Sequence, residues 1–298
     1  MAVLGAGRVG TSLGAALRRA GWNVASVACR RSASARESAR LIGGGAAPFT
    51  DIRAAAERGD VVFLCLPDRE IAGAARRLGA SSARWDGKAV FHTGGALPAS
   101  ALAPLRKRGA AVASFHPVRS FPVKDASGRL FAGVSVALEG DPKAAAVGAR
   151  IVKALGGRTL RLRPEQKEAF HAACAVVSNY LVVLLDTAEA TLVRAGIKDR
   201  NAVRALRDLA QGTLRNVNSV DTRRALTGPI VRGDAETVGR HLRALRGSPR
   251  HREVYVALGR AALDLAERRG LPADRVRALR SRLGERRPLP RARRRTSS

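Results

Sequence analysis

Polar side chains stand where several predicted strands end. The residues in these positions are Asp68, His92, Thr93, His116 and Arg119. Because ligands of parallel α/β sheets bind beyond the carboxyl ends of the strands, we expect these side chains to face a bound molecule. A histidine there can exchange a proton with a hydroxyl or an amine, so we interpret His116 as a catalytic residue and Arg119 as a substrate contact. The alternative is that His92 and His116 hold loops by hydrogen bonds.

A long predicted helix carries a polar stripe. Lys167, His171, Cys174 and Ser178 recur at positions i, i+4, i+7 and i+11, which places them on one face, and Asn179 lies beside them. Polar groups in an otherwise apolar helix need partners if they are buried. We predict that this face forms a wall of the substrate cleft, with His171 as a second proton-transfer residue, Asn179 orienting the substrate and Ser178 contacting it. The alternative is hydrogen bonding between domains.

A third polar group lies in the turn Thr227–Asp234, which contains Gly228 and Pro229. Asp234 can cap the following helix, which leaves Arg232 free to bind a ligand. An arginine that points into the cleft would hold a substrate carboxylate through paired hydrogen bonds, whereas one that points outward would be a surface residue. We predict a substrate-binding role for Arg232.

Three glycines in residues 5–10 are spaced as G-x-G-x-x-G, between a short apolar run and a helix-patterned stretch over 8–20. In a dinucleotide-binding turn, the first glycine makes the bend and the second lets the backbone approach a pyrophosphate. The third packs the helix on the strand. Glycine makes up 30 of the 298 residues, so the spacing is weak by itself and its place between strand and helix gives it weight. The predicted contacts are Gly5, Gly7, Arg8, Val9 and Gly10. The first strand has three residues, which is short for a central strand, so we expect apolar residues to precede it in the native protein.

The second predicted strand, over 23–29, is followed by Arg30, Arg31 and Ser32, with no acidic residue beside them. NAD-binding folds place a carboxylate near this point, whereas guanidinium groups bind a 2′-phosphate. We therefore predict NADP(H) as the cofactor. The remaining predicted cofactor contacts follow later strands and are Leu66, Pro67, Asp68, His92, Thr93 and Gly94.

The elements that position these groups alternate between strands and helices up to about residue 163. Strands are predicted over 60–67, 88–93, 110–115, 133–138 and 158–162. Helices are predicted from an N-cap at Asp68 to about Gly79, near 99–108 and over 142–155. After Pro164 the pattern is helical throughout, over 164–195, 201–211, 234–246, 251–269 and 272–283. This predicts an α/β fold: a doubly wound Rossmann-type sheet over 1–163, followed by an all-helical domain over 164–284 that forms one wall of the substrate cleft.

Composition limits the class of protein. The net charge is +30, but the arginines are spread along the chain and aromatic residues make up 4%, so specific nucleic-acid binding is not expected. The exception is the basic tail over 285–298, which we expect to be disordered and to contact polyanions nonspecifically. The cysteines Cys29, Cys65 and Cys174 are isolated, so no metal site is expected, and they fit a reducing cytoplasm. No uninterrupted run of 18 apolar residues occurs, so no membrane span is expected.

The motifs together resemble those of a known family. In order along the chain these motifs are Gly5–Gly10, Leu66–Asp68, His92–Ala96, Ser114–Pro117, Phe170–Ala173, Ser178–Asn179 and Gly228–Asp234. The chain resembles a bacterial family with a Rossmann-like NADP-binding N-terminal domain and a C-terminal domain of unknown function, whose members are described as NADP-dependent or, in some cases, deazaflavin-dependent oxidoreductases. More distantly it is similar to 6-phosphogluconate and 3-hydroxyacid dehydrogenases, ketopantoate and pyrroline-carboxylate reductases, and prephenate dehydrogenases. The resemblance implies a homodimer formed through the helices.

The chain also departs from these relatives. Hydroxyacid dehydrogenases and ketopantoate reductases carry a catalytic lysine four residues before a helix asparagine, where this chain has Ala175. The family commonly has Ser at Gly94 and Tyr at Phe170, so two hydroxyls are absent. We therefore predict an NADP(H)-dependent oxidoreductase for a small carbonyl, hydroxy or imino acid that uses histidine for proton transfer. The alternatives are a non-catalytic NADP-binding sensor or scaffold, and a nucleic-acid-binding protein.

Overall fold

The computed structural model describes residues 1–284, and the predicted tail over 285–298 lies outside them. The described residues divide into two compact units, one of Met1–Asn179 and one that begins at Tyr180. The division falls inside helix α7 (Lys167–Arg194), so the first unit includes the first part of a helix that we had predicted to begin the second domain.

An eight-stranded sheet forms the centre of the first unit, in the order β3-β2-β1-β4-β5-β6-β7-β8. The strands are β1 (Ala2–Leu4), β2 (Ser26–Ala28), β3 (Ala47–Phe49), β4 (Val61–Leu64), β5 (Ala89–His92), β6 (Ala111–Pro117), β7 (Ser135–Gly140) and β8 (Arg158–Arg161). All neighbouring strands are parallel except β6 and β7. The order of the first six strands is that of a doubly wound dinucleotide fold, which confirms the predicted fold class.

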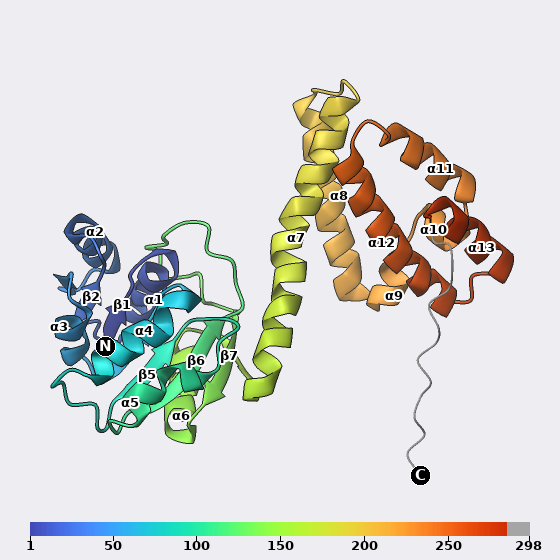
Figure 1. Cartoon of the computed structure of the whole chain (residues 1–298). Helices are drawn as coiled ribbons and strands as arrows, with labels where there is room; N and C mark the ends of the chain where they lie inside the picture. Colours follow the sequence, from blue (N-terminus) through green and yellow to red (C-terminus); the bar gives the residue numbers. More distant parts are fainter. Residues whose placement is uncertain (285–298) are drawn as a thin grey trace, which may run out of the picture. The chain divides into compact units, whose positions relative to one another are not determined.

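Helices cover both faces of the sheet (Figure 1). One apolar cluster joins the sheet to α1 (Arg8–Arg19), α2 (Ser32–Ile42) and α6 (Pro142–Ala154). The other joins it to α3 (Ile52–Glu57), α4 (Asp68–Gly79), the 3-10 turn η1 (Ala99–Leu102) and α5 (Ala103–Arg106). Successive strand residues alternate between the two clusters, as Val3 and Leu4 do, because side chains of a strand point to opposite faces.

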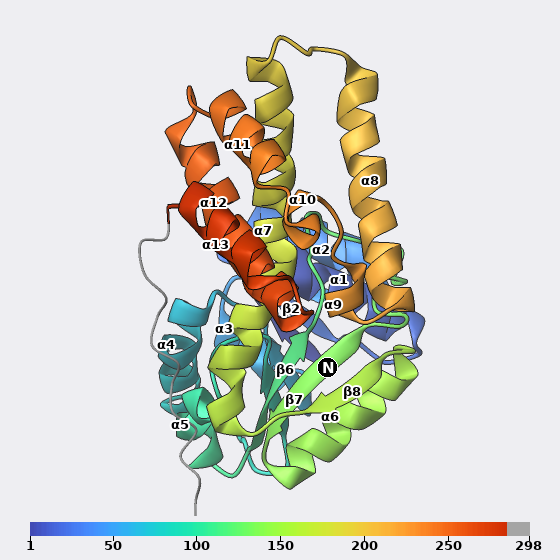
Figure 2. The same ribbon diagram turned by 90° about the vertical axis from the view of Figure 1, so that its right-hand side faces the viewer.

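Figure 2 shows β6, β7 and β8 side by side with α6. Three aromatic side chains on neighbouring strands form the centre of the α6 face. The Phe63 ring centroid lies 5.0 Å from that of Phe91 and 5.3 Å from that of Phe115. Burial of these large rings stabilises the packing of β4, β5 and β6, whose carboxyl ends carry the candidate site.

The second unit is helical over its described residues, as predicted. After the end of α7 it contains α8 (Arg200–Ser219), α9 (Thr222–Ala225), α10 (Pro229–Arg232), α11 (Ala235–Ala244), α12 (Pro249–Arg268) and α13 (Ala273–Arg282). Its apolar core is small and includes Val238, Leu263 and Leu279. Asp234 caps α11 as predicted, because its side chain accepts a hydrogen bond from the Thr237 amide at 2.9 Å.

Several predicted elements differ from the structure. Asp68 does not cap α4: Pro67 is the N-cap and Asp68 is the first helical residue. The helix predicted near 99–108 is divided into η1 and α5, and α8 extends eight residues past its predicted end at 211 (219 − 211 = 8). The elements α2, β3 and α3 lie in residues 32–57, for which no secondary structure was predicted. That segment has no long apolar run, so its pattern gave no signal.

Within residues 1–284, one helical segment, Pro164–Arg194, is long and apolar enough to cross a membrane by length and composition. None of its most apolar window is buried within the chain. The prediction of no membrane span stays a prediction, because one helix of this length and hydropathy is weak evidence for a span. The core helix of a soluble protein can pass the same test.

Candidate functional site

The turn between β1 and α1 has the geometry that its glycines predict. Gly5 has a positive φ of 89°, and a Cβ there would lie 2.6 Å from the Cys65 carbonyl oxygen. A Cβ on Gly10 would lie 2.6 Å from the Gly5 carbonyl oxygen, so Gly10 lets α1 pack against the turn. Nothing lies within 4 Å of the equivalent position on Gly7. The backbone at Gly7 is therefore open to a ligand at the N-terminus of α1.

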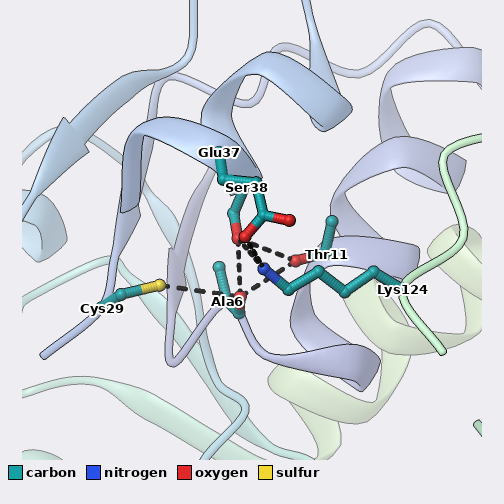
Figure 3. A network of polar contacts seen from close by, with 6 residues as sticks. All are labelled: Ala6, Thr11, Cys29, Glu37, Ser38 and Lys124. Carbon is teal, nitrogen blue, oxygen red and sulfur yellow. Dashed lines mark hydrogen bonds and ion pairs between the residues drawn. The ribbon is translucent and has the colours of Figure 1, made fainter. Parts of the chain in front are cut away.

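Hydrogen bonds from polar side chains hold the backbone of this turn in place (Figure 3). The Ala6 carbonyl accepts hydrogen bonds from Thr11 Oγ1 at 2.9 Å and from Ser38 Oγ at 2.8 Å. The Cys29 thiol also donates to it at 3.6 Å. Thr11 and Ser38 are fully buried, so their satisfied hydroxyls tie α1 and α2 to the glycine turn.

A cavity of about 630 Å³ opens beside the turn. Of the predicted cofactor contacts, those that line it are Gly5, Gly7, Arg30, Arg31, Leu66 and Pro67. Ser32 does not: its hydroxyl accepts a hydrogen bond from Arg36 at 2.7 Å, and Ser34 lines the cavity instead. Arg8, Val9 and Gly10 form the first turn of α1 but are not among the lining residues.

The cavity also contains acidic residues, which sequence reasoning missed. Glu37 and Glu70 line it together with Arg30 and Arg31. Glu37 lies one helical turn beyond the start of α2, so a search of the residues beside Arg31 does not find it. Its carboxylate accepts a hydrogen bond from Lys124 Nζ at 2.6 Å, which holds the pKa of Glu37 below its usual value.

A second set of polar residues forms a buried row across three strands. The strand register places His92 of β5 beside Ser114 of β6, and Ser114 beside Glu139 of β7. All three are buried. Lys167 from the start of α7 is also buried, and its Nζ donates to Ser114 Oγ at 2.6 Å. The fold therefore places an ammonium and a carboxylate in an apolar interior, next to the histidines.

His92 holds its own loop. The Gly94 amide donates to His92 Nδ1 at 3.1 Å, so Nε2 carries the proton and donates to the Pro98 carbonyl at 3.2 Å. Burial, followed by the nearby Lys167, lowers the pKa of His92 to about 4. His92 lines neither the cavity beside the glycine turn nor the cavity at His116, so its geometry matches the alternative in which it holds a loop.

His116 and His171 meet at right angles, with ring centroids 5.5 Å apart. His116 Nδ1 lies 3.4 Å from the Thr93 carbonyl, which makes Nδ1 the donor and leaves Nε2 as an acceptor. A Cβ on Gly95 would overlap the His171 ring and lie 3.0 Å from His116 Cε1, so the contact of the two rings requires glycine there. Burial, together with the nearby charge of Lys167, lowers the pKa of His116 to about 4.

These histidines line a cavity of about 300 Å³. It is bounded by the end of β6 and the first part of α7, and the predicted residues that it brings together are His116, Arg119, His171, Ser178 and Asn179. His171 Nδ1 is buried and has no hydrogen-bond partner among residues 1–284. This nitrogen faces the Gly95 backbone, so the His171 ring is held by packing and not by a hydrogen bond at Nδ1.

The other predicted contacts lie near these cavities or in the second unit. The Thr93 carbonyl accepts from His116, and a Cβ on Gly94 would lie 2.8 Å from Asp68 Oδ1. The Ser that the family commonly has at position 94 would therefore need Asp68 to move. Arg232 is exposed at the end of α10, and its carbonyl accepts from Arg275 at 2.9 Å. Its role in binding a substrate stays a prediction.

Two family models match the sequence. Residues 1–117 match a Rossmann-like domain, and residues 134–262 match the Domain of unknown function (DUF2520). No curated protein matches the chain.

Solved structures share the fold across most of the chain. Protein BF3122 from Bacteroides fragilis, which carries the provisional name NADP oxidoreductase, is 23% identical with a TM-score of 0.74, and the match covers 88% of this chain and 96% of that one. Protein TM1727 from Thermotoga maritima is 24% identical with a TM-score of 0.67, covering 90% and 98%. A reductive aminase from Aspergillus terreus, solved with NADPH and ethyl levulinate, is 18% identical with a TM-score of 0.59, covering 95% and 91%. At these identities the likeness concerns the fold.

Proposed function

We propose that this chain, in which a Rossmann-like domain is joined to a DUF2520 domain, is an NADP(H)-dependent oxidoreductase for a small carbonyl, hydroxy or imino acid. One observation carries the proposal: the open glycine turn at Gly7 and the guanidinium groups of Arg30 and Arg31 line a single cavity. The names of the structural neighbours are consistent with it, because one carries the name NADP oxidoreductase and another was solved with NADPH.

The residues present fit the cofactor. Gly7 leaves room for a pyrophosphate at the start of α1, and Arg30 and Arg31 follow β2, where the adenosine ribose binds in this fold. When bound, the nicotinamide supplies or accepts a hydride. The protein has to hold the substrate against it and move a proton.

His116 is suited to the proton-transfer role. Its Nδ1–H is fixed on the Thr93 carbonyl, so neutral Nε2 can accept a hydrogen bond from a substrate hydroxyl or amine. A pKa of about 4 makes it a weak base in the free protein. A substrate carboxylate in the same cavity would favour the protonated ring and raise this pKa toward neutrality. The proposed catalytic group is therefore activated by the charge of its own substrate.

His171, Ser178 and Asn179 supply polar groups on the opposite wall of the cavity, along the first part of α7. We assign the His171 ring to the cavity wall beside the substrate, with its Nδ1 buried against Gly95. Arg119 is the cation in this cavity and is suited to bind the substrate carboxylate, a role that Arg232 would share.

We also propose a homodimer through the helices. Large apolar side chains of α7 and α8 are exposed in the single chain, among them Val177, Tyr180, Val182, Val183, Leu209 and Leu214. A soluble chain rarely leaves such a surface uncovered. Size-exclusion chromatography with light scattering is expected to give twice the 31.5 kDa mass of the chain. A monomer that stays in solution without detergent would contradict this part of the proposal.

Nucleotide binding tests the proposal. We expect wild type to bind NADPH at least tenfold more tightly than NADH, measured by nicotinamide fluorescence, because a 2′-phosphate gains charge-assisted bonds to two guanidinium groups. Arg30→Ala/Arg31→Ala is expected to lose this preference. Arg76→Ala/Arg77→Ala removes the same charge from the exposed end of α4 and is the control. Failure to bind either nucleotide would refute the proposal.

Turnover separates the enzyme from a non-catalytic sensor. We would add carbonyl and imino acids to the NADPH complex and follow its absorbance. Oxidation of NADPH with one of them, lost in His116→Gln, supports the enzyme. Tight binding with no turnover across the panel would favour a sensor or scaffold, as the absence of a lysine at Ala175 also does.

A further inference from the structure

One residue of the nucleotide cavity comes from a distant part of the chain. Of the described residues that line it, Lys124 alone lies beyond residue 70. It belongs to the β6–β7 loop (residues 118–134), which joins two antiparallel strands. In the strand order, β4 and β5 separate these two strands from β1, which precedes the glycine turn. No motif near the glycine turn points to it.

The β6–β7 loop is anchored along α1. The Asp125 amide donates to Ser12 Oγ at 3.0 Å, and Arg8 reaches the Pro122 carbonyl at 3.5 Å. A Cβ on Gly128 would lie 2.9 Å from the Ala15 carbonyl oxygen, so the loop backbone contacts the helix closely there. These contacts on both sides of Lys124 fix where its side chain can reach.

The Lys124 ammonium lies between Glu37 and the support of the glycine turn (Figure 3). Its Nζ donates to Glu37 Oε2 at 2.6 Å and to Ser38 Oγ at 3.3 Å. Ser38 in turn donates to the Ala6 carbonyl. An ammonium has three N–H donors, and the described residues accept two, which leaves one for a ligand in the cavity.

The negative charge of Glu37 is unfavourable for a phosphate in this cavity. Its carboxylate lies in the cavity with Arg30 and Arg31, where a free negative charge would repel a 2′-phosphate and accept hydrogen bonds from unmodified ribose hydroxyls. The Lys124 side chain is 24% exposed and that of Glu37 is 50% exposed, so the pair remains accessible to solvent and ligand. A phosphate, with close to two negative charges, competes well with one carboxylate for an ammonium.

We infer that the Lys124–Glu37 ion pair determines selectivity for the 2′-phosphate: Lys124 neutralises Glu37 and supplies a third cation, beside Arg30 and Arg31, to the phosphorylated ribose. The inference rests on the proposed function, because it assigns Lys124 to the same nucleotide site. It makes cofactor choice depend on two segments that lie 87 positions apart in the sequence.

The test uses 2′,5′-ADP and ADP, which differ in the 2′-phosphate and report on binding without turnover. Isothermal titration calorimetry is expected to show that Lys124→Met weakens 2′,5′-ADP by about tenfold to a hundredfold, the range for loss of a hydrogen bond to a charged group. The affinity for ADP is expected to change less than twofold. Lys107→Met removes one charge from an exposed site outside the cavity and controls for net charge.

Glu37→Gln gives an independent arm, because it keeps the side-chain shape and removes the charge. We expect it to bind 2′,5′-ADP more tightly than wild type, and Lys124→Met/Glu37→Gln to recover part of the affinity that Lys124→Met loses. Unfolding of each variant, followed by tryptophan fluorescence, checks that it is folded.

Equal weakening of both ligands in Lys124→Met would overturn the inference, since Lys124 would then support the glycine turn without reading the phosphate. An unchanged 2′,5′-ADP affinity in Lys124→Met, with normal wild-type binding, would also overturn it and leave the proposed function intact. If wild type binds neither ligand, the proposed function and this inference both fail.

Discussion

Replacement of Lys167 by methionine tests whether the buried charges under the histidines are coupled. Methionine fills a similar volume, so the change removes the ammonium and keeps most of the packing. It deletes the hydrogen bond to Ser114 and leaves the buried Glu139 carboxylate, which accepts from the Ala99 amide at 2.6 Å, without a nearby cation. Loss of the partner of a buried polar group costs about 1–3 kcal/mol, and we expect a loss of unfolding free energy in that range.

The two tryptophans, Trp22 and Trp85, both lie in the first unit, so guanidinium chloride unfolding followed by tryptophan fluorescence reports on the unit that contains Lys167. A second variant, Lys167→Met/Glu139→Gln, leaves neither charge in the interior. We expect it to be more stable than Lys167→Met by about 1–2 kcal/mol. A double variant no more stable than the single one would refute the coupling.

The same substitution has an electrostatic readout. The Lys167 charge lowers the pKa of His116, which is about 4 in the wild type. In Lys167→Met we expect this pKa to rise toward the ordinary value of about 6.5, as followed by the Cε1–H chemical shift of His116 in NMR. A pKa that stays at 4 or falls would show that burial alone holds the ring neutral and that Lys167 has no influence on it.

Three further changes test the site. Gly7→Ala is expected to keep the unfolding free energy within about 1 kcal/mol of wild type and to weaken NADPH binding at least tenfold. Gly10→Ala is expected to destabilise the fold, because its Cβ would meet the Gly5 carbonyl. Equal stability of the two variants in denaturant unfolding would argue against these glycine roles. Gly95→Ala is expected to displace the His171 ring, with a moved His171 NMR signal and lost turnover but retained NADPH affinity, and an unmoved signal would contradict the contact. The pKa of His92 in the folded protein lies below its unfolded value, so its contribution to stability is complete above about pH 6.5 and is lost as the pH falls toward 4, by roughly 3 kcal/mol. His92→Gln should reduce this dependence of the unfolding free energy on pH. An unchanged dependence would exclude His92 as its source.

The sequence predicts the glycine turn and the sheet that carries it, and it predicts the residues around the turn less completely. Glycine spacing between a strand and a helix identifies Gly5 and Gly10, where a Cβ would clash with backbone, and Gly7, where the Cβ position is open. Glu37 and Lys124 could not be found this way, since their contact depends on how α2 and the β6–β7 loop pack on α1.

Similar limits apply to the substrate side. The helical spacing of Lys167, His171 and Ser178 indicates a shared face, and two of them line the cavity with His116. The helical spacing does not indicate that Lys167 is buried, because the hydrogen-bond partner of Lys167, Ser114, lies on a strand 53 positions earlier in the sequence. Strand register, which pairs Ser114 with Glu139, is likewise set by tertiary packing rather than by local pattern.

Helix α7 sets a rule for insertions and deletions in this chain. It begins with site residues and continues into the second unit, and its 28 residues contain neither proline nor glycine. Each residue added after Asn179 would turn everything downstream by about 100° around the helix axis and advance it by about 1.5 Å. Seven added residues would return the rotation to within about 20° while lengthening the helix by roughly 10 Å. One added residue therefore moves the following face of α7 by more than a quarter turn relative to His171 and Ser178, a shift that an ordinary loop connection would not transmit.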